Sequence, residues 1–520
     1  MRDFQAPGRS AAYARQAMVA TSHPDAARVG VEVLRAGGSA ADAAIAASAV
    51  LAVAEPQNAG LGGDTFYIHA DATGRISAYN GSGRTPAALD AAAIGTVGLD
   101  SVHSVTIPGA VDALLHLHET HGRLPLDRLL APAIALAAQG WIVQPRVAWD
   151  WQASRQRLAA SPSARAFWGR QVSAGARICQ PALARTLRDI AVNGREGFYR
   201  GETAQGLVRL LRGLGGAHTM ADFAAHAGTP VVPIETTYRG LRVLQCPPNG
   251  QGMTVLMLLN LLSGLDMGAL WQDQPAFAHS FAQACQLAYA ERDRWLADPA
   301  CAQMPLATLI GQPHAARLRA LMNPAAMLAL PPPISEPPHR DTVYLACVDA
   351  DGQAISFINS LFTDFGSAIH DEASGLLLHN RGASFAPFGD HPNALAPAKR
   401  PMHTIIPGMV MEGARPLMPF GVMGGHYQAA GQAFVLSAML DAGLDPQAAL
   451  DLPRHFAFNG EVEMESGVPQ AVADALAALG HKVRRAARPI GGGQIIRIDH
   501  AQGVLIGGSD PRKDGYALGY

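Results

Sequence analysis

Two kinds of hydrophobic pattern alternate over the first eighty residues. Apolar residues recur at helical spacing from Asp25 to Leu34 and again from Ser39 to Val53, and Gly37 and Gly38 between them form a helix stop signal. The segment AEPQNAGLGGD then breaks the second helix. After it, TFYIHA and RISAYN alternate apolar and polar residues around a D-A-T-G turn, which is typical of a β-hairpin.

The middle of the chain, roughly Ser101 to Leu330, is predicted to be mostly helical. Apolar faces at Leu207–Leu214 and Val255–Leu262 indicate two of these helices, and PPNGQG at 247–252 is predicted to be a loop. The proline-rich stretch PPPISEPPHRD at 331–341 follows. Such a stretch has no means of burying itself, so we predict an exposed and cleavable linker.

The pattern after the linker predicts mainly strands. TVYLACVD, A-D-G and QAISFINS together are typical of a hairpin in which Gly352 supplies a left-handed turn position. Further strand-like runs are LLLHN, TIIPGMV, QIIRID and GVLIGG, and helices are predicted at Ala429–Leu440 and Pro446–Leu452. Sheets sandwiched by helices follow from this order, which gives a layered α/β (α+β) fold.

The hairpin has a definite register if Asp349 and Gln353 flank a three-residue turn. Thr342 then lies directly across from Ser360, and opposed hydroxyls about 5 Å apart at their Cβ atoms can hydrogen-bond. Pairs of this kind are also common in sheets for purely structural reasons, so both interpretations stay open on register alone.

Composition and charge narrow the class of function. At 520 residues, 49% hydrophobic and 16% charged, the chain is predicted to form two domains or one layered unit built from two chain segments. Its net charge of -2 gives no reason to expect nucleic acid or a membrane as partner. The five cysteines are scattered and are predicted to be buried, without disulfides or a zinc site. Without the apolar run of a secretory signal, we expect a cytoplasmic enzyme acting on small molecules.

A series of ordered motifs makes nearly the whole chain resemble the γ-glutamyltransferase family of N-terminal-nucleophile hydrolases. They include MVATSHPDAARVGVEVLRAGGSAADAA, EPQNAGLGGD, YRGLRVLQCPPNGQG, LAYAERDRWLADP, KRPMHTIIP, GVMGG and PQAALDLPR. The resemblance implies an αββα sandwich formed by both halves of a precursor that cuts itself before a threonine. It implies a large (α) subunit, residues 1–341, and a small (β) subunit, residues 342–520. The two would stay together as a heterodimer, alone or as a dimer of heterodimers, with no cofactor.

The resemblance also assigns catalytic roles. In the family, cleavage frees the α-amine of the threonine, and this amine, with a pKa near ~8, serves as base for the neighbouring hydroxyl. Thr342 matches that nucleophile, and Ser360 stands where the family usually has a second hydroxyl that bonds it. Gly424 and Gly425 in GVMGG match the pair whose backbone N–H groups form the oxyanion hole. Without the resemblance, this pair would be interpreted only as a turn.

The residues expected to bind substrate differ from those of true γ-glutamyl enzymes. Phe362, Arg381 and Ser384 occupy the positions that hold the substrate's α-amino group there, and His403 and Thr404 replace two serines that contact its α-carboxylate. An ammonium would meet an arginine and no carboxylate. These donors suit instead an acyl group with a carboxylate and no amine. The departures resemble the branch of oxamate amidohydrolases and glutaryl-cephalosporin acylases.

Two arginines carry competing interpretations. Arg84 lies two residues later than the family's carboxylate-binding arginine, and is assigned either to carboxylate binding or to a solvated loop. Arg381 either binds the substrate's carboxylate or pairs with Asp364 or Asp371 to brace a loop.

The remaining histidine motifs are interpreted as structural. HLHETH at 116–121 is one residue short of H-E-x-x-H and lacks a third ligand, which favours a solvated helix face over a metal site. No metal is therefore expected. The histidines His23, His370, His379 and His391 have no recognisable partners in the sequence.

Three hypotheses of function follow. The leading one is an autoprocessing amidohydrolase that hydrolyses the amide of an oxamate-like or glutaryl-like acyl group through an acyl-enzyme on Thr342. The alternative is a γ-glutamyltransferase or glutathione hydrolase that recognises its amine through other groups. The third is an unprocessed, non-catalytic binding protein, against which Thr342, Ser360 and the glycine pair argue together.

Overall fold

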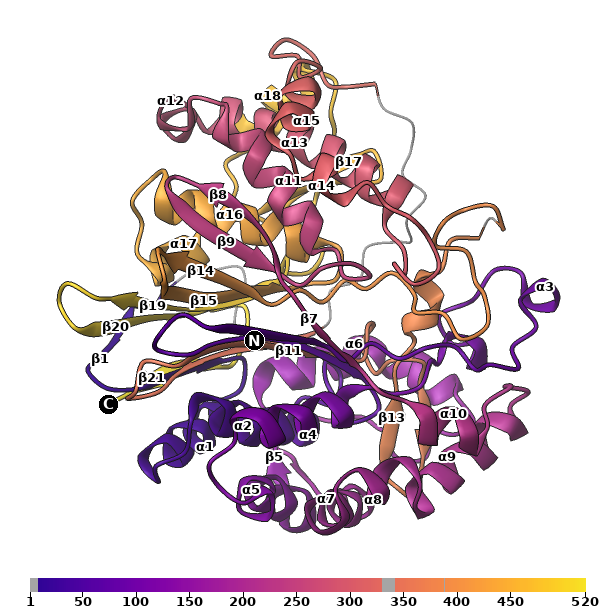
Figure 1. Ribbon diagram of the computed structural model, residues 1–520. Coiled ribbons are helices and arrows are strands. Elements are labelled where there is room, and N and C mark those ends of the chain that lie inside the picture. The colour runs from indigo at the N-terminus through magenta and orange to yellow at the C-terminus, as the bar shows by residue number, and fades with distance from the viewer. Residues whose placement is uncertain (1–7, 330–341, 388) are drawn as a thin grey trace.

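The computed structural model describes residues 8–329, 342–387 and 389–520, and arranges them in four layers (Figure 1). Two seven-stranded sheets lie face to face in the middle of this described part, and helices cover the outer face of each. This is the layered α/β sandwich that the sequence predicts.

The first sheet contains the predicted hairpin. The hairpin lies at its centre, paired antiparallel with strands from the N-terminal part of the chain on both sides. In order across the sheet, the strands are β21 (Tyr516–Gly519), β2 (Met18–Thr21), β10 (Val343–Val348), β11 (Ala354–Ser360), β3 (Asp64–Ala70), β4 (Ile76–Asn80) and β7 (Thr229–Val231).

The second sheet also draws on both halves of the chain. In order, its strands are β1 (Ala12–Ala14), β20 (Val504–Ser509), β19 (Gly492–Asp499), β15 (Arg415–Met423), β14 (Gly408–Glu412), β9 (Leu241–Gln245) and β8 (Ile234–Tyr238). The β8–β9 hairpin lies in the region predicted to be mostly helical, so that prediction was incomplete. Its turn residues Arg239 and Gly240 have φ of 52° and 80°. Two left-handed residues in succession are what a tight two-residue hairpin needs.

Smaller sheets lie outside the sandwich. LLLHN, predicted as a strand, contributes to a two-stranded sheet rather than to either large one. These strands are β12 (Ile369–Asp371) with β13 (Leu376–Leu378), β16 (His455–Phe458) with β17 (Glu461–Met464) and β18 (Lys482–Arg485), and β5 (Trp141–Ile142) with β6 (Arg177–Ile178).

One helical layer packs against the first sheet. The two N-terminal helices were both predicted from the sequence. The layer comprises α1 (Pro24–Arg35), α2 (Ala40–Ala54), α4 (Ala110–His121), α5 (Leu126–Gln139), α6 (Pro145–Ala160), α7 (Pro181–Asn193), α8 (Arg195–Tyr199), α9 (Glu202–Gly213) and α10 (Met220–Ala225). Two short elements, α3 (Ala91–Ile94) and η1 (Val102–Ser104), lie in the connection between β4 and α4.

The other helical layer packs against the second sheet. It comprises α11 (Gly252–Ser263), α12 (Met267–Gln272), α13 (Gln274–Trp295), α14 (Leu306–Leu309), α15 (Gln312–Arg319), α16 (Tyr427–Leu440), α17 (Pro446–Asp451) and α18 (Gln470–Ala478). The 3-10 turn η2 (Arg381–Ser384) follows β13. Helices α16 and α17 match the two that the C-terminal pattern predicts.

Three apolar layers hold the sandwich together. The middle layer, between the sheets, includes Phe66, Tyr344, Ile358, Met409 and Met423. Helix α2 lies in the layer beneath the first sheet, and all of its residues are buried. Its alanines permit this, because a helix with small side chains can be packed closely on every face.

Several expectations change in the folded chain. Cys179 and Cys301 are exposed, so the prediction of uniformly buried cysteines is wrong for these two, although all five are free thiols. HLHETH is a solvated face only in part: Glu119 and Thr120 are exposed, but His116 bonds the Tyr67 hydroxyl at 2.6 Å and His121 bonds Ser77 Oγ at 2.8 Å. The proline-rich stretch at 331–341 lies outside the described residues.

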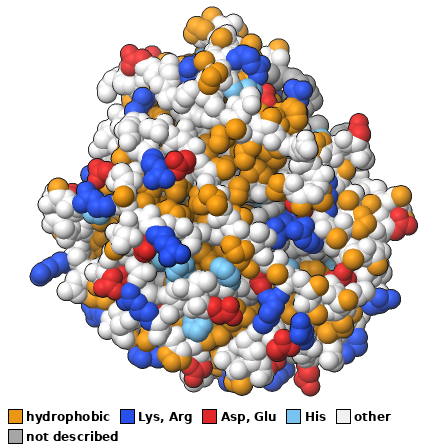
Figure 2. Space-filling view, viewed as in Figure 1, with side chains coloured by type: hydrophobic (Ala, Val, Ile, Leu, Met, Phe, Trp, Pro, Cys, Tyr) orange, Lys and Arg blue, Asp and Glu red, His pale blue; other side chains and the backbone are white. Residues whose placement is uncertain are grey.

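The charge distribution on the surface and the length of the helices are relevant to possible binding partners. Figure 2 shows acidic and basic side chains interspersed over one face, with apolar side chains exposed between them. Among the helices of the described residues, none combines the length and the apolar character needed to cross a membrane.

A buried histidine makes stability depend on pH. His455 packs against the edges of Phe277, Phe281 and Phe434, and burial lowers its pKa to about 4. Between about pH 6.5 and 4 the unfolded chain therefore binds a proton that the folded chain does not, so stability falls as pH falls.

We expect His455→Phe to remove this pH-dependent loss of stability. In the wild type, the loss in free energy of unfolding reaches about 3 kcal/mol near pH 4. The melting temperature of the variant relative to wild type should rise as pH is lowered from 7.5 to 5. His500→Phe, at a half-exposed position, is the control. If the difference in melting temperature between His455→Phe and wild type is the same at pH 7.5 and pH 5, the prediction is contradicted.

Candidate active site

The nucleophile hairpin has the register that the sequence predicts. Val343 pairs with Asn359 and Val348 with Ala354, and Thr342 Oγ1 lies 3.2 Å from Ser360 Oγ. Both hydroxyls are buried. Ser360 Oγ also accepts a hydrogen bond from the backbone N–H of Phe362 at 2.9 Å. The serine oxygen is thereby oriented, and its hydrogen remains available to Thr342.

The far end of the hairpin is tied to the first turn of α2. Asp349 Oδ1 accepts hydrogen bonds from the backbone N–H groups of Asp351 and Gln353, both at 3.0 Å. Its Oδ2 accepts from the N–H of Ala40 at 2.9 Å, at the N-terminus of α2. A carboxylate is favourable at that end of a helix. The hairpin is therefore held at its turn as well as by its neighbours.

Glycines in AGLGGD allow a second segment to approach the hairpin closely. A Cβ at Gly63 would stand 2.4 Å from the carbonyl oxygen of Ser360, and one at Gly62 would stand 2.1 Å from that of Leu377. Both separations are far shorter than van der Waals contact. The motif therefore brings Asp64, which follows it directly, to the hairpin.

The predicted oxyanion glycines form the turn between β15 and α16. Gly424 and Gly425 have φ of 122° and 57°, and a Cβ at Gly424 would lie 2.9 Å from Gly491 Cα. Gln251 Nε2 donates to the carbonyl of Gly425 at 3.0 Å and to that of Thr404 at 2.9 Å. Glycine is thus required here by both conformation and space.

Gln428 joins this turn to the nucleophile, and the sequence pattern did not single it out. It lies in the first turn of α16 and is fully buried, and its Nε2 donates to Thr342 Oγ1 at 3.3 Å. The available signal was a pair of glutamines, Gln428 and Gln432, in a mostly apolar helix, because buried amides nearly always have partners.

Arg381 is held between an aromatic ring and a hydroxyl. It is 1% exposed, its guanidinium carbon lies 3.8 Å from the centroid of the Phe362 ring, and its Nη1 donates to Thr404 Oγ1 at 2.9 Å. Phe362 adopts a φ of 80°, an uncommon conformation for a bulky residue. A run of contacts therefore connects Thr342 to Arg381 by way of Ser360 and Phe362.

The acids proposed to brace Arg381 have other partners. Asp364 pairs with Arg488 at 3.0 Å. Asp371 accepts from the backbone N–H and the hydroxyl of Ser374, at 2.9 and 2.5 Å. The bracing alternative therefore finds no support in the contacts of either carboxylate.

A buried carboxylate lies near Arg381 instead. Asp64 Oδ2 is 3.0 Å from His403 Nε2 and 3.5 Å from His379 Nδ1, and its Oδ1 accepts from the N–H groups of Gly83 and Gly109. Burial by itself raises the pKa of Asp64, but His379, His403 and Arg381 outweigh it and hold the pKa below its usual range. Burial lowers the pKa of His403 to about 3. Asp64 is therefore ionised beside neutral imidazoles at neutral pH.

His403 does not face a substrate as predicted. Its Nδ1 accepts from the N–H of Ile405 at 3.3 Å, so its Nε2 carries the hydrogen and donates to Asp64. Both ring nitrogens are thereby occupied, and His403 supports Asp64. His379, which lacked a recognisable partner in the sequence, belongs to the same group.

Two other predicted residues also bond within the fold. Ser384 Oγ lies 2.8 Å from the carbonyl of Arg381 and 2.6 Å from that of Met402, so it braces η2. Arg84 pairs with Asp298 at 3.0 Å while its side chain is 37% exposed. Arg84 is thus a partly exposed loop arginine in an ion pair, and its role stays a prediction.

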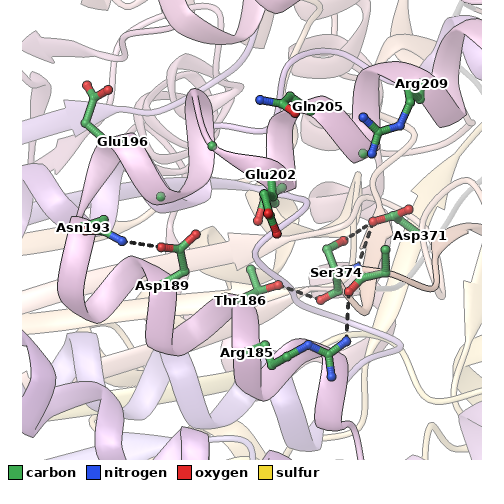
Figure 3. A pocket seen from close by; sticks show the side chains of 15 residues that line it. Arg185, Thr186, Asp189, Asn193, Glu196, Glu202, Gln205, Arg209, Asp371 and Ser374 are labelled. Atoms are coloured by element: carbon green, nitrogen blue, oxygen red, sulfur yellow. Dashed lines mark hydrogen bonds between the residues drawn. The ribbon is translucent and has the colours of Figure 1, made fainter.

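Two cavities lie at different places relative to the candidate active site around Thr342. The larger, about 820 Å³, lies among α7, α8, α9 and the turn after β12 (Figure 3), and none of the predicted site residues lines it. Its polar groups bond one another, as Thr186 does with the carbonyl of Ser374. The smaller, about 130 Å³, borders the site through Ser384, Met402 and His426. Of the predicted site residues, Ser384 alone lines the smaller cavity.

Comparisons with known proteins agree with this geometry. A family model described as Gamma-glutamyltranspeptidase matches residues 26–520. The chain is 37% identical to the Glutathione hydrolase-like YwrD proenzyme of Bacillus subtilis (strain 168), over 96% of this chain and 98% of that protein. It is 32% identical to the Oxamate amidohydrolase proenzyme of Klebsiella pneumoniae subsp. pneumoniae, over 97% and 98%. Among solved structures, a cephalosporin acylase from Bacillus halodurans matches with a TM-score of 0.92 and 36% identity, over 99% of this chain and 97% of that one.

We expect Ser360→Ala to lower kcat about ten- to a hundredfold, because Thr342 Oγ1 loses a hydrogen bond worth about 1–3 kcal/mol in the transition state. Ser356→Ala is the matched control: it lies on the same strand, is equally buried, and bonds Tyr344 at 2.8 Å. Steady-state kinetics on any amide that the wild type hydrolyses would test this. Equal kinetics in the two variants would show that Ser360 does not assist Thr342.

Proposed function

The chain belongs to the γ-glutamyltranspeptidase family, and from this premise we propose that it hydrolyses the amide of a carboxylate-bearing acyl group through an acyl-enzyme on Thr342. The family's hydrolases act on amide bonds, and the chain is an enzyme of this kind. The observation that carries the proposal is the contact of Thr342 Oγ1 with both Ser360 Oγ and Gln428 Nε2 in a buried site. Such contacts orient the hydroxyl for attack.

Maturation comes first in this proposal. The peptide bond between Asp341 and Thr342 is cut by attack of the Thr342 hydroxyl on the carbonyl of Asp341, and water hydrolyses the resulting ester. The products are the carboxylate of Asp341 and the α-amine of Thr342. Relatives named as proenzymes support this step. The two resulting chains stay together as a heterodimer, because β2 and β3 precede the cut and flank β10 and β11, which follow it.

Turnover then uses the new amine. It takes the proton of the Thr342 hydroxyl while Oγ1 attacks the substrate's carbonyl, and the leaving amine receives that proton as the C–N bond breaks. Water attacks the acyl-enzyme in the same way, releasing the acid and restoring the Thr342 hydroxyl. We assign the developing oxyanion to the backbone N–H groups of Gly424 and Gly425, whose turn is joined to the nucleophile by Gln428.

Substrate selection in this proposal rests on Arg381. A planar guanidinium fixed against Phe362 and bonded to Thr404 suits a carboxylate, and a substrate ammonium would be repelled by it. The relatives named oxamate amidohydrolase and cephalosporin acylase are in line with an acyl group that carries a carboxylate.

A second candidate is glutathione hydrolysis. The relative named Glutathione hydrolase-like, which is 37% identical to this chain, favours it. In that case the amine of the γ-glutamyl group would be held by groups other than Ser384, whose hydroxyl is occupied by backbone carbonyls.

We expect the purified precursor to cleave itself between Asp341 and Thr342. A denaturing gel should show residues 1–341 and 342–520 as bands of about 36 and 19 kDa, in proportion to 54.5 kDa for 520 residues. N-terminal sequencing of the smaller chain should begin at Thr342. Thr342→Ala should remain a single chain without amidase activity, because it lacks the attacking hydroxyl. A mature wild-type enzyme that is active as one uncut chain would overturn the mechanism.

We expect Arg381→Gln to weaken kcat/KM for acid amides by about 2–4 kcal/mol, because one side of a desolvated charge pair is lost. Arg381→Lys should recover only part of this, since an ammonium keeps the charge but not the planar pair of donors. Substrates for comparison are oxamate, a glutaryl anilide and a γ-glutamyl anilide.

Self-cleavage should stay normal in both variants, because no free carboxylate substrate takes part in it. Arg185→Gln, in the separate cavity of Figure 3, is the matched control for loss of an arginine. Full activity of Arg381→Gln on acid amides, or a wild-type preference for the γ-glutamyl anilide, would favour the glutathione hydrolase alternative.

A further inference from the structure

Gln428 contacts the reacting oxygen and is fixed by a second bond. Its Nε2 donates to Thr342 Oγ1 at 3.3 Å, and its Oε1 accepts from the backbone N–H of Ile406 at 3.3 Å. The side chain is fully buried. Because the Ile406 N–H can bond only an oxygen, the orientation of the amide is decided: the NH₂ group must face Thr342.

Resting on the function proposed above, we propose that Gln428 is a further catalytic residue, which stabilises negative charge on Thr342 Oγ1 when this oxygen attacks and when it leaves. A side-chain amide is neutral at working pH and donates only from its nitrogen, so Gln428 cannot be the base. Its contribution is an oriented dipole aimed at an oxygen whose charge changes during the reaction.

Thr342 Oγ1 can accept a hydrogen bond from Gln428 Nε2 at each step of the reaction. When the α-amine removes the hydroxyl proton, Thr342 Oγ1 holds three lone pairs. Ser360 and Gln428 stabilise two of them, and the third forms the bond to the substrate's carbonyl carbon. In deacylation the α-amine takes a proton from water as water adds to the acyl carbon, the C–Oγ1 bond breaks, and its electron pair returns to Oγ1. That oxygen then takes a proton from the α-ammonium. Gln428 stabilises the same atom as nucleophile and as leaving group.

The same helix supplies a matched control. Gln432 lies one turn further along α16, is also fully buried, and bonds the carbonyl of the same residue, Ile406, through its Nε2 at 2.7 Å. Its Oε1 accepts from Gln245 Nε2 at 2.7 Å. Both glutamines therefore brace Ile406, but the second bond of Gln428 goes to Thr342 and that of Gln432 goes to Gln245. A purely structural role would make the two sets of variants behave alike.

The test compares Gln428→Glu, Gln428→Met, Gln432→Glu and Gln432→Met as the processed enzyme, on the wild type's best amide substrate. Each Gln428 variant should lower kcat about ten- to a hundredfold at neutral pH with little change in KM. The Gln432 variants should lose melting temperature to a similar extent and keep kcat within about threefold. Self-cleavage should slow in the Gln428 variants, since it uses the same oxygen.

The pH profile separates catalysis from bracing. The carboxyl group that Gln428→Glu introduces is buried, so its pKa is expected to rise. Once protonated, this group can again donate to Thr342 Oγ1 while its carbonyl accepts from Ile406. The deficit of Gln428→Glu relative to wild type should therefore shrink as pH falls, and that of Gln428→Met should stay constant. If a Gln428 variant does not cleave itself, the processed enzyme is obtained by co-expressing residues 1–341 and residues 342–520 as two separate chains, the second of which begins at Thr342.

Failure of this inference is distinguishable from failure of the proposed function. Wild type that turns over through Thr342, with Gln428 variants indistinguishable from their Gln432 counterparts in kcat and pH profile, overturns the role of Gln428 alone. Retained activity in Thr342→Ala overturns the function itself, and the role of Gln428 with it.

Discussion

The pairing of the β10–β11 hairpin with β2 and β3 is the interaction on which the rest of the structure depends. It joins strands that precede residue 341 to strands that follow residue 342, and it buries every residue of the hairpin strands. Buried strands must satisfy all their backbone groups, so each strand holds its neighbours in one register. That register is what sets Thr342 against Ser360.

The site assembled around this hairpin is rich in polar groups in a region with little water. The structure balances the charges locally: Asp64 is ionised and accepts a hydrogen bond from His403, His379 lies 3.5 Å from it, and Arg381 lies close enough to lower the pKa of the acid. Such a balance lets an arginine remain buried beside the nucleophile.

The features that this chain shares with its family and the residues predicted to select a substrate lie in different parts of the molecule. The contact of Thr342 with Ser360 and the turn at Gly424 and Gly425 are set by the backbone, and the chain belongs to a family of amide hydrolases. The residues predicted to bind substrate, such as Arg381 and Thr404, are instead side chains on η2 and on a connection outside the sandwich. Relatives of similar overall identity to this chain carry names as different as glutathione hydrolase-like, acylase and oxamate amidohydrolase.

The sequence by itself determined what depends on neighbours along the chain. The helices α1 and α2 follow from apolar spacing and glycine stops, and the hairpin register follows from one turn and the alternation of β-strands. Only the tertiary structure decided the pairs between distant segments. His403 bonds Asp64 across 339 residues, Arg84 bonds Asp298 across 214, and Gln428 reaches Thr342 across 86. The type of a residue determines which groups its side chain can hydrogen-bond. Its actual partner depends on the tertiary structure, because the packed sheets and helices must bring the two side chains within about 3 Å of each other.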